Sequence, residues 1–124
     1  FEVGNTAFGF TMLVPKSDEV SVDELISSHA QWMSETHSLG KEEGKLHTLE
    51  YFVSKATEFN DMMDPEKGST GNVIYTVNEV HIDDEHFGKH VELGQSWERF
   101  GEFFELFEKY SPLVTMGGRV YQKL

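Results

Sequence analysis

Two histidines in the stretch EHFGKH, residues 85–90, have the spacing to act together on one molecule. His86 and His90 are four residues apart, so in a helix both imidazoles lie on the same face. That face continues with apolar, mostly aromatic side chains, namely Leu93, Trp97, Phe100, Phe104 and Phe107. Burial among such side chains favours the neutral imidazole, which can take a proton from a phenol or an activated carbon acid. We expect His90 to be the first catalytic base and His86 the second.

Two other interpretations of the histidine pair stay open. Imidazoles four residues apart can ligate one metal ion, with His81, Asp83 or Glu85 as a third ligand. Phe87 stands where the metalloprotease motif has its glutamate, so that motif is incomplete. Alternatively, the imidazoles are core residues with hydrogen-bonded partners and no chemistry. We prefer the proton acceptor and expect no metal and no other cofactor.

The helices that carry these residues should share one cavity. Residues 20–40 predict a helix that begins with the capping-box pair Ser21 and Glu24 and has His29 on its apolar stripe. Residues 84–110 predict a second helix, in which two glycines favour a break into two segments. We expect the substrate-binding walls to include five residues of these helices: His29, Trp32, Phe87, Trp97 and Phe100.

Alternating apolar residues predict four strands, at residues 6–14, 45–59, 72–82 and 113–124, with a loop at 60–71. With the helices, the order is βαββαβ, which is the order of the ferredoxin-like fold. The sequence therefore predicts a single α+β domain spanning residues 1–124. A four-stranded antiparallel sheet would have both helices on one face, because both crossovers have the same hand.

The second face of this sheet is too apolar to be left to water. In the third strand Val73, Tyr75 and Val77 point to one face and Ile74 and Val80 to the other. The second strand likewise has Leu49, Tyr51 and Val53 on one face and Leu46 and Phe52 on the other, so both faces are apolar. A solvated antiparallel face normally alternates to polar residues. We therefore expect a homodimer through sheet-to-sheet packing, which makes the pair a dimeric α+β barrel.

The charge of the chain excludes several classes of partner. The 124 residues carry a formal net charge of -12 and the pI is about 4.8. Phosphate backbones and anionic membranes repel such a chain, so we expect neither nucleic acid nor a membrane as partner. There is no cysteine, which removes thiol chemistry and suits a cytoplasmic location.

The stretch NEVHIDDEHFGKHVEL resembles antibiotic-biosynthesis-monooxygenase-type domains of the dimeric α+β barrel superfamily. Phe87 and His90 match the aromatic residue and the histidine of that pattern. Haem-degrading members carry an Asn in the first strand and a Trp before the second helix, whereas Thr11 and Met12 stand in this first strand and His81 takes the place of the Trp. A shorter stretch, HAQWMSETHSLGKEEGKL, resembles YCII-type domains, with His29 as the matching histidine.

The resemblance and the histidines together predict a small-molecule-binding protein. The leading expectation is a cofactor-independent monooxygenase or isomerase that acts on a small aromatic or polyketide-like compound. The alternative is a non-catalytic binding or structural homodimer whose histidines only pack. A metal-binding protein is the third possibility.

Overall fold

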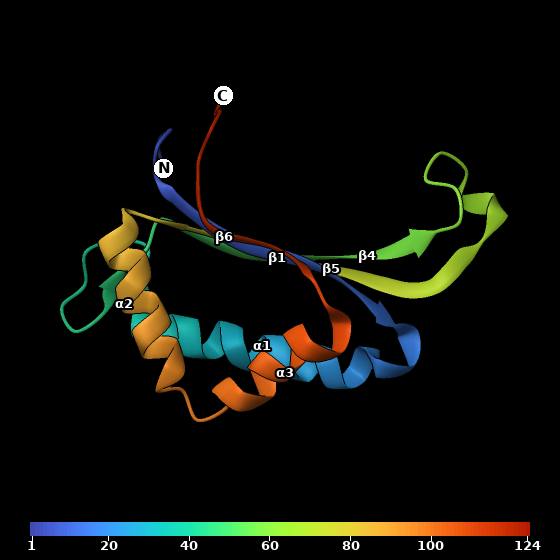
Figure 1. Ribbon diagram of the computed structural model, residues 1–124, viewed down its shortest axis with the longest axis horizontal. Coiled ribbons are helices and arrows are strands. Elements are labelled where there is room, and N and C mark those ends of the chain that lie inside the picture. Colours follow the sequence, from blue (N-terminus) through green and yellow to red (C-terminus); the bar gives the residue numbers. More distant parts are fainter.

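The computed structural model, which covers residues 1–124, contains a four-stranded antiparallel sheet with helices on one face (Figure 1). The strands lie in the order β4 (Glu50–Phe59), β5 (Ser69–His81), β1 (Thr6–Pro15) and β6 (Leu113–Arg119). All three neighbouring pairs are antiparallel. Each of the four predicted strand regions thus contributes one strand to this sheet, although the second begins only at Glu50 and the fourth ends at Arg119. The arrangement is compatible with a ferredoxin-like fold.

Three α-helices form the second layer, namely α1 (Glu19–Thr36), α2 (Asp84–Gln95) and α3 (Phe100–Tyr110). Short 3₁₀ turns occupy Lys16–Asp18 and Pro65–Lys67. Helix α2 begins where the side chain of Asp83 accepts a hydrogen bond from the backbone N–H of His86 at 2.8 Å. The predicted break in the second helical region is confirmed, because residues 96–99 separate α2 from α3.

The predicted ends of the first helix are wrong at both sides. Helix α1 begins at Glu19, so Ser21 lies inside it, and the Ser21 hydroxyl donates to the carbonyl of Asp18. Glu24 forms an ion pair with Arg99 instead of closing a capping box. The helix ends at Thr36, because His37 takes an extended conformation and leaves the helix axis.

The chain after α1 forms a small structure of its own. Strands β2 (His37–Ser38) and β3 (Leu46–His47) pair in parallel, apart from the main sheet. The predicted strand at residues 45–59 is therefore divided into β3 and β4. Thr48 lies at this division, and its backbone N–H donates to the carbonyl of Ser38 at 2.9 Å. The result is that His37 and Thr48 are held beside the end of β5.

The core lies between the sheet and the helices. On β5, Val73, Tyr75 and Val77 are buried under the helices, while Ile74 and Val80 lie on the other face, as predicted. Residues of β1, α1 and α3 complete this core, which consists of Phe10, Met12, Val14, Val22, Leu25, Ile26, Val73, Tyr75, Val77, Phe103 and Leu106.

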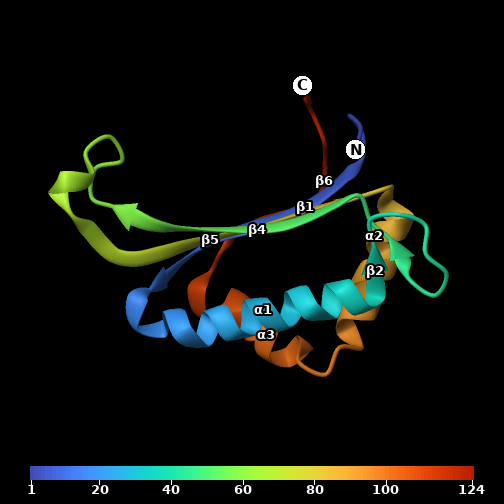
Figure 2. The same ribbon diagram turned by 180° about the vertical axis from the view of Figure 1, so that it is seen from behind.

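The hairpin formed by β4 and β5 extends beyond the helical layer (Figure 2). Its tip is exposed: Met62 and Met63, which lie in the predicted loop, have exposed fractions of 87% and 82%. None of the helices is both long and apolar enough to cross a membrane.

Candidate functional site

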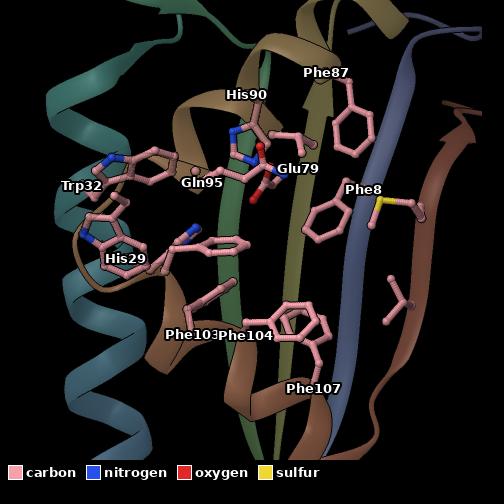
Figure 3. Close-up of a pocket in the computed structure, with 16 residues that line it drawn as sticks. Phe8, His29, Trp32, Glu79, Phe87, His90, Gln95, Phe103, Phe104 and Phe107 are labelled. Atoms are coloured by element: carbon pink, nitrogen blue, oxygen red, sulfur yellow. The ribbon is translucent and has the colours of Figure 1, made fainter.

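An apolar pocket lies between the sheet and the ends of the helices (Figure 3). Its volume is about 360 Å³, and 11 of its 16 lining residues are hydrophobic. Small-molecule sites commonly have about 300–1,000 Å³ and apolar walls with a few polar groups. The few polar groups here include His29, His90, Glu79 and Gln95.

Most of the predicted site residues come together in this pocket. The predicted residues that line the pocket are His29, Trp32, Phe87, His90, Trp97 and Phe100. His86 does not line it. Its Nδ1 atom lies 2.8 Å from Oδ1 of Asp83, and its side chain is 27% exposed. The four-residue spacing from His90 places the two imidazoles on neighbouring turns of α2, but His86 lies at the first turn, where it packs against the helix cap.

Residues of the sheet close the pocket on the side opposite the helices. Phe8 of β1 stacks on Phe87 of α2 with ring centroids 5.7 Å apart. Val114 and Met116 of β6 line the same wall. Trp32 stacks on Trp97 at 5.6 Å, which joins α1 to the segment between α2 and α3.

Glu79 of β5 is the residue that sequence reasoning missed. It is almost fully buried, with an exposed fraction of 2%, and it lines the pocket. The signal was present, since residues 73, 75, 77, 79 and 81 share one face of a strand and the first three are core residues. A glutamate on that face had to be buried, and a buried carboxylate requires partners.

Two histidines meet one oxygen of this carboxylate. Nε2 of His81 lies 2.9 Å and Nε2 of His90 3.0 Å from Oε1 of Glu79. Burial would raise the pKa of Glu79, but His81 and His90 beside its Oε1 outweigh burial and lower the pKa, so the carboxyl is ionised. The other oxygen, Oε2, is buried and has no hydrogen-bond partner.

The Nδ1 atoms of His81 and His90 also have hydrogen-bond partners. Nδ1 of His90 lies 2.9 Å from Nε2 of His37, and Nδ1 of His37 lies 2.7 Å from Oγ1 of Thr36. Nδ1 of His81 lies 3.1 Å from Oγ1 of Thr48. Both nitrogens of His90 thus have partners inside the protein. The acceptor atom that is free to meet a ligand is therefore Oε2 of Glu79 and not a nitrogen of His90.

His29 belongs to the wall of the pocket. Its ring stacks on Phe103 with centroids 4.4 Å apart, and its Nδ1 lies 2.9 Å from the hydroxyl of Tyr51. Burial lowers the pKa of His29 to about 4, and burial likewise lowers the pKa of His37 to about 4. Both are therefore neutral near pH 7. Burial also raises the pKa of Tyr51, so its hydroxyl stays protonated.

Comparison with known proteins adds no assignment. No family model matches the chain, and no curated protein and no solved structure shows a significant match to it. An ionised, buried carboxylate with a free oxygen, backed by imidazoles and facing apolar rings, can accept a hydrogen bond or a proton from a bound molecule.

Proposed function

We propose that the protein binds a small aromatic molecule that carries a hydroxyl or another acidic hydrogen, and that Glu79 accepts this hydrogen. Two observations carry the proposal: Glu79 lines the apolar pocket, and its buried Oε2 has no hydrogen-bond partner. Leaving a buried acceptor without a donor costs about 1–3 kcal/mol, and more when it is charged. A ligand that donates to Oε2 removes this penalty, whereas a purely apolar ligand does not.

The reaction that suits this site is proton removal from a phenol or an activated carbon acid. The proton passes through Oε2 of Glu79 and goes on to the product, because the lowered pKa of this carboxyl does not let it keep the proton, and the substrate becomes an electron-rich anion during the transfer. Such an anion either returns a proton to another carbon, which is an isomerisation, or reacts with molecular oxygen as the oxidant. We therefore propose a monooxygenase or isomerase whose proton acceptor is supplied by its own side chains. His90 would support Glu79, because its Nε2 faces Oε1 of the same carboxylate.

We further propose that the protein acts as a homodimer, in which the sheets of two copies pack face to face. Support comes from the face that the helices leave uncovered, where Leu13, Phe52 and Leu113 are exposed by 46%, 50% and 83%. Obligate dimers of this kind bury about 2,000 Å² or more in total. The dimer would form a barrel whose pockets lie on the outside, next to the helices.

A pair of matched ligands tests the binding proposal. Titration with 2-naphthol and with 2-methoxynaphthalene, read by the fluorescence of Trp32 and Trp97, compares one aromatic body with and without a donor. A hydrogen bond to a charged group contributes about 1.5–3 kcal/mol, so we expect naphthol to bind roughly 10- to 150-fold more tightly. The substitution Glu79→Gln should reduce the difference to that of a neutral hydrogen bond, about 0.5–1.5 kcal/mol, because the amide oxygen still accepts but is uncharged. The exposed Glu105→Gln should leave the difference intact.

The same titration separates the rival function. If neither compound quenches the tryptophans, or if both bind equally to the unaltered protein, the pocket does not use Glu79 for recognition. The histidines and Glu79 would then serve only the structure of a non-catalytic dimer. Oxygen uptake or loss of a carbon-bound deuterium from a bound phenol would distinguish a monooxygenase from an isomerase.

A further inference from the structure

Two imidazole nitrogens and one carboxylate oxygen meet in a buried cluster behind the pocket wall. The atoms are Nε2 of His81, Nε2 of His90 and Oε1 of Glu79, and they all lie within 4.8 Å of one another. The exposed fractions of these residues are 0%, 7% and 2%. We propose that this cluster binds one divalent transition-metal ion.

The hydrogen bonds at the Nδ1 atoms of His81 and His90 indicate that the Nε2 atom of each ring carries a lone pair. The hydroxyl of Thr48 donates to the carbonyl of Val80 at 3.0 Å, so its oxygen can only accept from Nδ1–H of His81. The neutral form of His81 with this proton on Nδ1 has its lone pair on Nε2, which faces Glu79.

The hydrogen bonds of His37 and His90 have the same directions. The hydroxyl of Thr36 donates to the carbonyl of Trp32 at 2.7 Å, so it accepts from Nδ1–H of His37. Nε2 of His37 then accepts from Nδ1–H of His90, and Nε2 of His90 carries a lone pair as well. Metal-bound histidines are held in this way, with the second nitrogen donating to a fixed acceptor.

The hydroxyls of Thr48 and Thr36 donate to backbone carbonyls, so the Nδ1 atoms of His81 and His90 are protonated. Without an ion, hydrogen bonds to Glu79 would require a second proton, on Nε2 of each ring. Two doubly protonated rings, His81 and His90, would then lie with centroids 4.7 Å apart in a site without water contact. An ion uses the two lone pairs and the carboxylate charge directly. The 2.9 and 3.0 Å between Oε1 and the two nitrogens agree with a six-coordinate ion, because ligand atoms about 2.1 Å from a metal and at right angles to each other are about 3.0 Å apart.

The donor set limits the identity of the ion. Two imidazoles and one carboxylate suit Zn²⁺, Fe²⁺ or Co²⁺, whereas Ca²⁺ and Mg²⁺ prefer oxygen ligands. The carboxylate would hold the ion through Oε1, which leaves the unpartnered Oε2 for a ligand of the pocket that Glu79 lines. This inference goes beyond the proposed function, because ligand recognition at Oε2 needs no ion at Oε1.

Titration of chelator-treated protein with Co²⁺ tests the proposal. We expect one ion per chain and, in the proton NMR spectrum of the Co²⁺ protein, two strongly shifted exchangeable signals from Nδ1–H of His81 and His90. His81→Gln should weaken binding at least 100-fold, and Thr48→Val, which removes the acceptor of His81 Nδ1–H, roughly 10-fold. His86→Gln should bind like the unaltered protein.

The competing arrangement has both threonine hydroxyls turned toward the imidazoles and only hydrogen bonds to Glu79. It predicts no stoichiometric Co²⁺ and no shifted signals, and that result would overturn the proposal. Equal binding by folded His81→Gln and unaltered protein would do the same. If His81→Gln does not fold, the two signals of the unaltered protein decide alone. Naphthol titration of the chelator-treated protein shows separately whether ligand recognition at Glu79 stands.

Discussion

The acid sensitivity of the fold should depend on His29. In the folded chain burial lowers its pKa from 6.5 to about 4. The unfolded chain therefore binds more protons than the folded chain between these values, and stability falls as the pH falls through this window. The groups that face His29 are Tyr51 on β4, Glu79 on β5 and His90 on α2; Glu79 raises this pKa and His90 lowers it, and both effects are smaller than that of burial.

The size of the effect follows from the two pKa values. For a single group with these values, lowering the pH from 7 to 5 reduces the free energy of unfolding by about 2 kcal/mol. His29→Leu removes the titrating ring at nearly constant volume. We expect the variant to lose about 2 kcal/mol less than the unaltered protein over this range, whatever its stability at pH 7.

Urea unfolding followed by tryptophan fluorescence at pH 7, 6 and 5 measures this difference. Tyr51→Phe is the matched control, because it removes the hydrogen-bond partner of His29 at 2.9 Å and keeps the buried imidazole. The control should retain the pH dependence of the unaltered protein. Parallel pH profiles for His29→Leu and the unaltered protein would refute the reasoning, because they would mean that His29 is protonated equally in the folded and unfolded chains.

Three further predictions concern the scaffold. Replacing residues 61–67 by a two-residue turn should leave the melting temperature nearly unchanged in calorimetry, because Met62 and Met63 are exposed and closure entropy changes slowly with loop length; loss of folding would contradict this. Phe52→Glu should convert the proposed dimer to a monomer in sedimentation equilibrium, whereas the exposed Val20→Glu on α1 should not, and an unchanged mass for both would count against sheet-to-sheet packing. Gly9→Ala should destabilise the sheet by about 1–3 kcal/mol in urea unfolding, because the added Cβ would lie 2.5 Å from the carbonyl oxygen of Val77, and equal stability would show that β5 can shift freely.

The strands and helices could be predicted because their patterns are local. Alternation on β1 and β5 and the apolar stripe of α1 each occur within one element, so the burial of Met12, Tyr75 and Ile26 follows from the period alone. Helix ends were less predictable, since they depend on competing partners. Ser21 and Glu24 have the spacing of a capping box, but Glu24 pairs with Arg99 from a distant part of the chain.

The positions of the pocket-lining residues could be predicted where a single helix determines them, but not where distant segments meet. His90, Phe87 and Trp32 lie on apolar stripes, and the structure places them in the pocket. His37 could not be identified, because its role depends on the turn out of α1 and on its contact with His90, 53 residues away. The spacing of His86 and His90 placed both on one helix face, but a local contact decides the position of His86. Its ring lies against Asp83, which caps the first turn of α2.

Glu79 is the residue for which a purely structural explanation is weakest. Its Oε1 lies within hydrogen-bond distance of Nε2 of His81 and of His90, but its Oε2 has no partner. Burying a charged acceptor without a donor lowers stability. An apolar residue at this position would continue the row of Val73, Tyr75 and Val77 and would remove that penalty. The buried charge is therefore best explained by a partner that the folded chain does not itself contain. A donor in the pocket would satisfy Oε2, and an ion between His81 and His90 would neutralise the carboxylate, so the two proposals address the two oxygens of one side chain.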